Sequence, residues 1–542
     1  MSSRMKTSYV ALFLSIALVV GILLGVWLES FSSEKEQSEV FSDYQKVSAT
    51  TRKLGGVIGM ILNTYVDSVS LEDLETNLLS SLLDNLDPHS LYIDKKEYVT
   101  EKEHLSGYFE GLGIYLWKKD DTVNIHNVYP DGPSKKAGIL NGDQIITING
   151  ANIVELGISL DSVVSLLRGR KGSMAKLGIK RYGAPELLQY EVQRDIIYIK
   201  SIPYSGMLDT SIGYICIETF TSSTADEAKN AIERLKGEGM KKLILDLRNN
   251  GGGLFGQAIE IADMFLPKGR LIVYTEGLHS PKVECYSTSN SVFENGELVI
   301  MLNENSASAS EVVAGALQDN DRGVIVGRRS FGKALVQEQI ELFDGSALLL
   351  TTARYYTPSG RCIQRSYDKG KYEYYVDFLR RVLIDLQSDS IVQEINDTVK
   401  YYTREGRVVY GGGGIYPDIV LAHEKDTCLV YYNEIIKSNL IQEYAFDYGI
   451  KNREKLLEKY PNPNDFIEGY SITAEMFNDF IHKVDEAGVK RNNKALRFYK
   501  EDMKILLKAR LAYLLYSEEI SYRLFLPKDR ELQKTIDIIK EK

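Results

Sequence analysis

Three serines, Ser306, Ser308 and Ser310, and a lysine, Lys333, are of the types that could together cleave an acyl bond. A serine hydroxyl becomes a strong nucleophile when a neighbouring base takes its proton, and a neutral lysine amine can be that base. An ordinary lysine has a pKa of about 10.4 and stays protonated at neutral pH. Because burial disfavours the charged ammonium, this chemistry requires apolar surroundings for Lys333.

The segment around Ser308 predicts a strand, a tight turn and a helix. Residues 298–302 form an apolar run of strand length, and a helical pattern of apolar residues begins at Val312. Ser308 stands three residues before Glu311, which is the spacing of a capping box, so capping the helix would be a sufficient explanation of this serine. No glycine flanks it or the serines on either side, which excludes the G-x-S-x-G nucleophile elbow.

The segment around Lys333 leaves two alternatives. Gly327 ends a predicted strand, and the run SFGK precedes another apolar strand, so Lys333 enters an apolar setting. A lysine in such a place either extends its amine to water as an ordinary surface residue, or is desolvated and loses its proton near neutral pH. Only the second alternative supplies a base for a serine.

Four motifs in this part of the chain resemble those of the C-terminal processing peptidases, also called tail-specific proteases. They are DLRNNGGG at 246–253, SASASEVVAGALQD at 306–319, SFGKALVQ at 330–337 and TTARYYTPSGRCIQ at 351–364. The resemblance implies a serine peptidase with Ser308 as nucleophile, Lys333 as base and Gln337 as the residue that supports the lysine. It also implies an oxyanion hole formed by the backbone amides of Ala309 and of a glycine in the Gly-rich turn, Gly252.

The sequence departs from the family pattern at two positions. Gly251 stands where proline is usual, and Ala334 stands where glycine usually follows the lysine. Both are small residues, so we expect adjusted loops and an intact site. The glycine turn before a helix can hold an anion such as a tetrahedral oxyanion, but it lacks the G-x-x-x-x-G-K-[ST] spacing of a nucleotide-binding loop.

A second resemblance covers residues 107–194, where short strands alternate with turns. The runs GLGIYL and VYPDGPSKKAGILNGDQIITING, followed by a helical SLDSVVSLLRG, resemble a PDZ domain. A PDZ domain binds a peptide C-terminus by adding it to a sheet as a strand. The loop of Leu112, Gly113 and Ile114 is expected to offer backbone amides to the terminal carboxylate, because its glycines let the backbone approach closely.

Residues 9–28 form an uncharged apolar run of about the length that a transmembrane helix needs. Arg4 and Lys6 precede the run and glutamates follow it, so the basic flank should stay in the cytoplasm. We therefore expect an uncleaved, single-pass signal anchor in the inner membrane, with the rest of the chain on the periplasmic side. A cleavable signal peptide is the alternative, which the length of the run and the lack of a clear A-x-A site disfavour.

The length of 542 residues, with 44% hydrophobic and 26% charged residues, indicates several ordinary globular domains. Alternating strand and helix patterns predict a mixed α/β core whose sheet is covered by helices. The expected domains are the anchor (1–30), a tether and helical region (31–105), the PDZ domain (106–195), the peptidase core (196–424) and a helical extension (425–542). In the extension, two apolar stripes are expected to be core packing: Phe477, Phe480, Ile481 and Val484, and Ile505, Ala509, Ala512 and Tyr516.

Several classes of function are disfavoured by composition. A formal net charge of −10 lacks the basic signature of nucleic-acid binding. The four cysteines contain no C-x-x-C pair and the six histidines no H-E-x-x-H pair, so we expect neither a metal nor another cofactor. His89 follows a proline in a predicted turn, where a structural role fits it better than that of a base.

These features favour a membrane-anchored serine endopeptidase that binds the C-termini of polypeptide substrates through its PDZ domain. The alternative from another class is a catalytically inactive PDZ scaffold in the cell envelope, which would have no use for a lysine buried beside a serine. A serine hydrolase with a histidine base is a third possibility, but no histidine lies in the matching motifs. The sequence leaves the oligomeric state open, a homo-oligomer included.

Overall fold

The computed structural model describes residues 46–119, 121–387, 399–423 and 428–541, which fall into two units divided after Leu83. The described part of the first unit contains a helix over residues 46–64 and nearly all of α2 (Leu71–Asp84), in which Leu71, Leu74, Leu78 and Leu82 recur at the spacing of a helix. The expected anchor, residues 9–28, lies outside the described residues. None of the helices that the structure describes is both long and apolar enough to cross a membrane.

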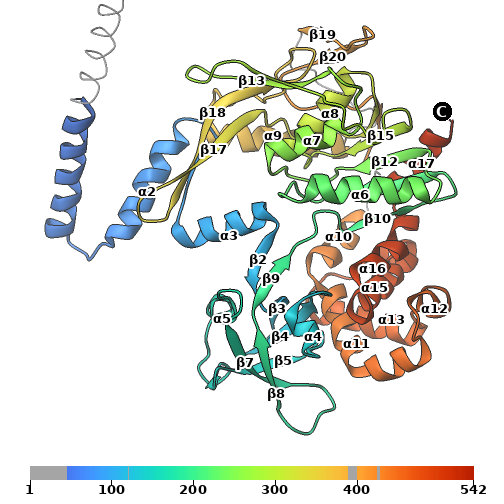
Figure 1. Cartoon of the computed structure of the whole chain (residues 1–542). Coiled ribbons are helices and arrows are strands. Elements are labelled where there is room, and N and C mark those ends of the chain that lie inside the picture. Colours follow the sequence, from blue (N-terminus) through green and yellow to red (C-terminus); the bar gives the residue numbers. More distant parts are fainter. Residues whose placement is uncertain (1–45, 120, 388–398, 424–427, 542) are drawn as a thin grey trace, which may run out of the picture. The chain divides into compact units, whose positions relative to one another are not determined.

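The second unit is built on a six-stranded sheet with the strand order β10-β11-β12-β15-β16-β21. Figure 1 labels three of its strands, β10, β12 and β15. Five strands run parallel, and β10 runs antiparallel at one edge. The strands are β10 (Tyr204–Met207), β11 (Ile212–Cys216), β12 (Lys242–Asp246), β15 (Glu297–Leu302), β16 (Val324–Gly327) and β21 (Ile419–Val420). Because parallel strands end at the same edge, the loops after β12, β15 and β16 emerge side by side.

Helices cover both faces of this sheet. On one face, α6 (Thr224–Gly237), α7 (Phe255–Asp263) and α8 (Ala309–Asp319) pack around inward residues of the strands such as Leu245. On the other face, Leu532 of α17 (Arg530–Glu541) packs with Ile244. Leu245 and Ile244 are neighbours on β12 and point to opposite faces, as successive strand residues must. The C-terminal helices are therefore part of the core of the peptidase sheet.

A second, antiparallel sheet carries the hairpin of β17 (Leu335–Glu341) and β18 (Ala347–Tyr356). The strand β18 also pairs with β1 (Leu91–Ile93) and with β13 (Leu271–Glu276), which in turn pairs with β14 (Val283–Tyr286). The β1 pairing brings the turn before β1 next to the start of the hairpin. Outside these two sheets lie the helices α3 (Lys95–Ser106) and α9 (Gly370–Gln387) and a separate two-stranded sheet of β19 (Lys400–Tyr402) and β20 (Val408–Tyr410).

The region that resembles a PDZ domain is a separate sheet with its own core. Its strands are β3 (Ile114–Lys119), β4 (Thr122–Val128), β5 (Gln144–Ile148), β6 (Ala151–Asn152), β7 (Met174–Lys180) and β8 (Leu188–Gln193). The helices are α4 (Pro133–Lys136) and α5 (Leu160–Leu167), and α5 is the helix that SLDSVVSLLRG predicts, capped by Ser159. A short pair, β2 (Tyr108–Gly111) and β9 (Asp195–Tyr198), joins this region to the rest.

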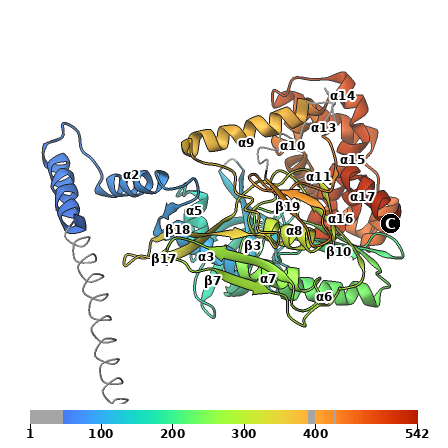
Figure 2. The ribbon, with the colours of Figure 1, turned by 90° about the horizontal axis from the view of Figure 1, so that it is seen from above.

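The C-terminal extension is helical, as expected (Figure 2). It contains α10 (Leu429–Lys437), α11 (Leu440–Lys459), α12 (Pro463–Gly469), α13 (Ala474–Glu486), α14 (Asn493–Phe498), α15 (Lys500–Leu515), α16 (Glu518–Phe525), η1 (Leu526–Lys528) and α17. The predicted stripe on α13 is buried, which confirms it as core packing. On α15 the prediction is only partly right: Ala509 and Ala512 are buried, but Ile505 and Tyr516 are partly exposed, and Met503, Leu507 and Leu511 carry more of the core face.

The outer face of the PDZ sheet packs against the extension. The rings of Trp117 and His126 lie 5.2 and 5.7 Å from the ring of Phe446 on α11. Lys119 forms an ion pair with Asp447 at 2.8 Å. The extension therefore contacts both the PDZ domain and the central sheet.

Candidate active site

Ser308 lies between β15 and α8, at the N-cap of the helix, with a strained backbone. Its φ is 54° and its ψ is −113°, whereas an ordinary N-cap residue has an extended backbone. A positive φ at a residue other than glycine persists only where the surrounding structure enforces it, and such residues cluster at active sites. The backbone of Ser308 is therefore not that of a simple helix cap.

The three serines of this segment differ in what their hydroxyls can do. Ser306 and Ser310 are fully buried, and their Oγ atoms donate to the carbonyls of Leu247 at 2.8 Å and Asn250 at 3.0 Å. Ser308 is partly exposed. The two neighbours thus fasten the segment to the turn after β12, and Ser308 is the serine of this group that a substrate can reach.

A single carboxylate links the loops of Ser308 and Lys333. Oε2 of Glu311 accepts hydrogen bonds from the backbone N–H groups of Ser308 and Lys333, both at 2.9 Å. Its Oε1 accepts from Ser330 Oγ at 2.5 Å and from the Gly332 N–H at 2.7 Å. Complete burial raises the pKa of the Glu311 carboxyl, and the four donors oppose that rise because they favour the carboxylate. The sequence predicts Glu311 only as a capping partner.

The Lys333 amine is held by the glutamine expected to support it. Lys333 Nζ donates to Gln337 Oε1 at 2.6 Å, and Gln337 Nε2 donates to the carbonyl of His89 at 2.6 Å. Burial lowers the pKa of Lys333, while the charges of Asp87 and Glu311 oppose that change. Of the two alternatives for this lysine, the desolvated one fits the structure.

The turn before β1 anchors Gln337 through its backbone. Asp87 Oδ1 accepts from the N–H groups of His89 and Ser90, both at 2.8 Å, and so closes the turn. Ser90 Oγ then accepts from the Thr351 N–H on β18 at 3.2 Å. These bonds place the His89 carbonyl where Gln337 reaches it. Nothing in the motifs around Ser308 points to this turn, because it lies far from them in sequence.

The imidazole of His89 is unsuited to act as the base. Burial, together with the nearby charge of Lys333, lowers the pKa of His89 to about 3. Its Nε2 lies 3.0 Å from the Tyr374 hydroxyl. A neutral imidazole with so low a pKa is a weak proton acceptor, so the structural role that the sequence favours for His89 fits better.

The two amides predicted for the oxyanion hole have different surroundings. Ala309 is the first residue of α8, so its N–H has no acceptor within the helix. Gly252 has a φ of 110° and passes so close that a Cβ on it would lie 2.8 Å from Ser308 Cβ. Its N–H, however, donates to Asn250 Oδ1 at 2.8 Å. The structure brings both residues to Ser308 and engages the Gly252 amide within its own turn.

A tyrosine of the TTARYYTPSGRCIQ motif bridges the loops of Ser308 and Lys333. The Tyr355 hydroxyl lies 2.9 Å from the carbonyl of Lys333 and 3.2 Å from that of Ser308, and it donates toward both. Its side chain is almost completely buried. Like Glu311, Tyr355 positions these two loops. The sequence motif contains this tyrosine but does not indicate its role.

The structure accommodates both departures from the family pattern. A Cβ on Gly251 would meet no atom within 4 Å, so this position has room for a larger residue. Ala334 is fully buried, and its N–H donates to Gln364 Oε1 at 2.7 Å. The expectation of small adjustments to the loops is consistent with this geometry.

The loop predicted to bind a peptide C-terminus lies at the start of β3, next to α5. The carbonyls of Leu112 and Gly113 accept from the N–H groups of Ser134 at 3.1 Å and Tyr129 at 3.0 Å, which fixes the loop. Gly113 has a φ of 68°, and a Cβ there would lie 3.2 Å from the Cα of Gly132. A glycine is therefore required at Gly113 by both conformation and space.

Three family models match this chain. They are peptidase family S41 over residues 211–370, the PDZ domain over residues 111–192, and a family of unknown function, DUF8443, over residues 431–517. The last of these covers most of the helical extension, so the match leaves the role of that region open.

Two relatives share about a third of their residues with this chain. The carboxy-terminal-processing protease of Bartonella bacilliformis is 35% identical over 351 residues, which are 64% of this chain and 80% of the relative. The carboxy-terminal processing protease CtpA of Bacillus subtilis is 32% identical over 366 residues, which are 67% of this chain and 76% of the relative. A solved structure, a photosystem II D1 C-terminal processing protease, is 29% identical, with a TM-score of 0.33, and the match covers 56% of this chain and 81% of that one. With a matching S41 model and relatives covered over most of their length, the chain belongs to the carboxy-terminal processing serine proteases of peptidase family S41.

Proposed function

We propose that this chain is a membrane-anchored endopeptidase that captures the C-termini of polypeptides through its PDZ domain and cleaves them with a Ser308/Lys333 dyad. The observation that carries the dyad is the shared carboxylate of Glu311. Its Oε2 accepts from the backbone N–H groups of both residues, so the nucleophile and the base are positioned from one buried point. The strained backbone of Ser308 supports the same assignment.

In the proposed reaction the neutral Lys333 amine takes the proton of Ser308 Oγ as that oxygen attacks the scissile carbonyl. Gln337 accepts a hydrogen bond from the amine and thereby orients it. The resulting ammonium gives its proton to the departing amine, which leaves an acyl-enzyme on Ser308. Water then attacks the ester while Lys333 takes a proton from it, and the ammonium returns that proton to Ser308 Oγ as the acyl–Oγ bond breaks and the peptide acid departs.

The tetrahedral oxyanion is stabilised by the N–H groups of Ala309 and Gly252 in this proposal. Ala309 offers its amide from the first turn of a helix, where the dipole also favours negative charge. Gly252 contributes if its N–H turns from Asn250 Oδ1 or is shared between the two acceptors. We infer that occupancy of the site by substrate rearranges this one bond.

The PDZ loop of Leu112, Gly113 and Ile114 receives the terminal carboxylate of the substrate in this proposal. Backbone amides at a loop with positive φ are a common way to bind an anion. The carbonyls of the first two residues are already engaged inside the domain, which fixes the backbone before any peptide binds. The substrate chain then extends along β3 as an added strand.

The proposed anchor is residues 9–28, and in this proposal it holds the enzyme in the inner membrane with the catalytic part outside the cytoplasm. A reporter enzyme that is active only outside the cytoplasm, fused after residue 542, should be active. Replacing residues 1–30 by a cleavable signal peptide should release the protease from the membrane fraction. Recovery of the intact chain in the cytosol would contradict both proposals.

The dyad is tested with Ser308→Ala, an unstructured substrate that has an apolar C-terminus, and fragment analysis. Cleavage should disappear, while thermal stability changes by no more than a helix cap, about 1 kcal/mol. Ser310→Ala is the matched control, because it loses a hydroxyl from the same segment and one hydrogen bond, worth about 1 kcal/mol, and should still cleave. Ser306→Ala should also cleave, at a larger cost in stability, because its Oγ both donates to the Leu247 carbonyl and accepts from the Asn303 N–H.

Two outcomes would redirect the assignment. Cleavage that survives in Ser308→Ala would remove this serine from the reaction. A wild-type chain that binds C-terminal peptides but releases no fragments would favour the inactive PDZ scaffold in place of the protease.

A further inference from the structure

The residues at the junction of η1 and α17 contact two parts of the molecule with alternate side chains. We call residues 528–531 the connector. Asp529 and Glu531 of the connector reach arginines of the peptidase core, while Arg530 lies between them in sequence and pairs with Asp502 of α15 at 3.5 Å. The connector thus fastens the helical extension to the core.

Asp529 is paired with the arginine of the DLRNNGGG motif. Arg248 donates to Asp529 Oδ2 at 2.6 Å, and it also pairs with Asp246 at the end of β12. The Arg248 side chain is only 13% exposed. A largely buried, bidentate arginine pair is stronger and less screened by salt than an exposed one. Arg248 lies four residues before Gly252, so Asp529 holds the base of the Gly-rich turn.

Glu531 bridges two loops of the proposed site. One oxygen accepts from Arg248 at 3.0 Å, and the other is paired with Arg328. Arg328 in turn donates to Glu304 at 2.7 Å. Arg328 lies five residues before Lys333, and Glu304 lies four residues before Ser308. The network therefore reaches the bases of all three loops that carry the proposed catalytic groups.

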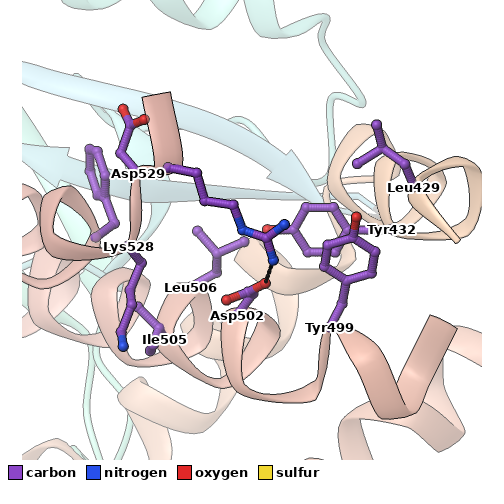
Figure 3. A pocket seen from close by; sticks show the side chains of 10 residues that line it. Leu429, Tyr432, Tyr499, Asp502, Ile505, Leu506, Lys528 and Asp529 are labelled. Carbon is purple, nitrogen blue, oxygen red and sulfur yellow. Dashed lines mark ion pairs between the residues drawn. The ribbon is translucent and has the colours of Figure 1, made fainter. Parts of the chain in front are cut away.

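The opposite side of the connector borders a cavity of about 330 Å³ in the extension. Figure 3 shows Lys528 and Asp529 on one side of this cavity and the stacked rings of Tyr432 and Tyr499 on the other. The ion pair of Arg530 with Asp502 spans it. On that side the ion pair of Arg530 with Asp502 joins the connector to α15.

We propose that Asp529 and Glu531 are positioning residues for peptide hydrolysis, through which the C-terminal extension arranges the loops of Gly252, Ser308 and Lys333. The proposal rests on the proposed Ser308/Lys333 dyad. Neither carboxylate touches the reacting atoms. They act through Arg248 and Arg328, which have further acidic partners in the core, Asp246 and Glu304.

The test is the isosteric double variant Asp529→Asn, Glu531→Gln in the full chain. The asparagine retains an oxygen that can accept the Leu532 N–H at the start of α17, so the helix should still form. At a temperature where the variant is folded, we expect kcat to fall at least about tenfold. KM should stay near the wild-type value. The pH at which kcat/KM rises should also stay the same, because neither carboxylate is among the charges that shift the pKa of Lys333.

A matched control removes two charges from the exposed side of the same helix. Asp537→Asn, Glu541→Gln should leave kcat unchanged. The coupling is checked with Glu531→Gln alone and in an Arg328→Gln background, where its effect on kcat should be smaller because only its contact with Arg248 is left to lose.

The possible results separate this inference from the proposed dyad. A double variant that is folded and turns over at the wild-type rate overturns the inference while leaving the dyad intact. Wild-type activity that survives Ser308→Ala overturns the dyad itself. A lower melting temperature of the double variant with an unchanged kcat would show that the connector only stabilises the fold, which also overturns the inference.

Discussion

Glu311 combines two requirements of the proposed chemistry within one side chain. Its hydrogen bonds fix the backbone of Ser308 and Lys333, and its charge raises the pKa of Lys333 against the effect of burial. Asp87 acts on the lysine in the same direction. Burial thus lowers the pKa of Lys333 while the two carboxylates raise it, so a single substitution at either carboxylate should shift this pKa in a known direction.

The pH dependence of turnover should follow Lys333. Its deprotonated form is the proposed base, and burial lowers its pKa below the ordinary value of lysine, so kcat/KM should rise with pH through one group in that lower range. Lys333→Arg keeps the charge but cannot be deprotonated, so it should be as inactive as Lys333→Ala. Steady-state kinetics across the neutral and alkaline range checks both statements. A Lys333→Arg enzyme that still cleaves would assign the base to another group.

Removal of the Glu311 charge should move that rising limb to lower pH. In Glu311→Gln the ammonium of Lys333 loses an attractive charge, so its pKa falls further. Two N–H groups would then face an amide nitrogen or lose an acceptor, which should cost about 1–3 kcal/mol of stability and lower kcat. Glu338→Gln, an exposed change on β17, is the control and should leave the limb in place. A shift of the rise in kcat/KM to higher pH would contradict the effect assigned here to the Glu311 charge on the pKa of Lys333.

At the scale of elements, the Gly-rich turn brings its backbone closest to Ser308. Gly252 has the positive φ and the close approach, whereas Gly251 next to it has open space. The turn is closed by Asn250, whose Oδ1 accepts from the Gly252 N–H and whose Nδ2 donates to the carbonyl of Ile217 at 2.8 Å. Of these two adjacent glycines, Gly252 is the one whose conformation and surroundings require a glycine.

Gly252→Ala and Gly251→Ala form a matched pair that tests whether Gly252 must be a glycine. In the first, the new Cβ strains the backbone and displaces Ser308, so we expect at least about tenfold lower kcat and a loss of about 1–3 kcal/mol of stability. The second should be close to wild type in both, because its Cβ meets no atom within 4 Å. Chemical denaturation and kinetics measure the two effects. Equal behaviour of the two variants would show that Gly252 is not close to the reacting serine.

Local patterns in the sequence predict most elements that carry the site. The apolar run before Ser308 and the capping spacing to Glu311 predict β15 and α8, and both form with nearly those bounds. The contacts that complete the site could not be predicted in this way. The carbonyl of His89 reaches Gln337 from 248 positions away, and Asp529 reaches Arg248 from 281. Pairing at such separation is set by the tertiary fold, which single-sequence periodicity does not encode.

The extension shows the same limit at the level of a helix face. Periodicity correctly places Phe480 in the core, because α13 has one clear apolar side. α15 is surrounded by α11, α14 and α16, so several of its sides are buried and no single stripe describes it. Ile505, expected in the core, borders the cavity beside the connector instead.

For the whole molecule, the PDZ domain cannot be considered apart from the helices that contact it. Removing residues 107–194 would expose Phe446 and leave Asp447 without Lys119, so a loss of activity in that deletion would have several explanations. A change to the C-terminus of the substrate tests the role of the domain and leaves the protein itself intact.

Amidation of the substrate's C-terminus should weaken turnover if the PDZ loop reads the carboxylate. The amide lacks the negative charge that the backbone N–H groups of Leu112, Gly113 and Ile114 would bind, so KM should rise while kcat stays near its value for the free acid. A short peptide that reaches the active site without engaging the PDZ domain is the control, and its amidation should have no effect. Equal KM values for the long acid and the long amide would show that the terminus is not read.

Trp117 offers a direct view of the contact between the PDZ domain and the extension. The sequence contains two tryptophans, and the other, Trp27, lies in the proposed anchor, so an enzyme lacking residues 1–30 has Trp117 as its only indole. This ring packs against Phe446 and His126. Its intrinsic fluorescence therefore reports on that interface without any label. A red shift of the emission when a C-terminal peptide binds would mean that capture of a substrate loosens the two parts, and an unchanged spectrum would mean that they act as one body during turnover.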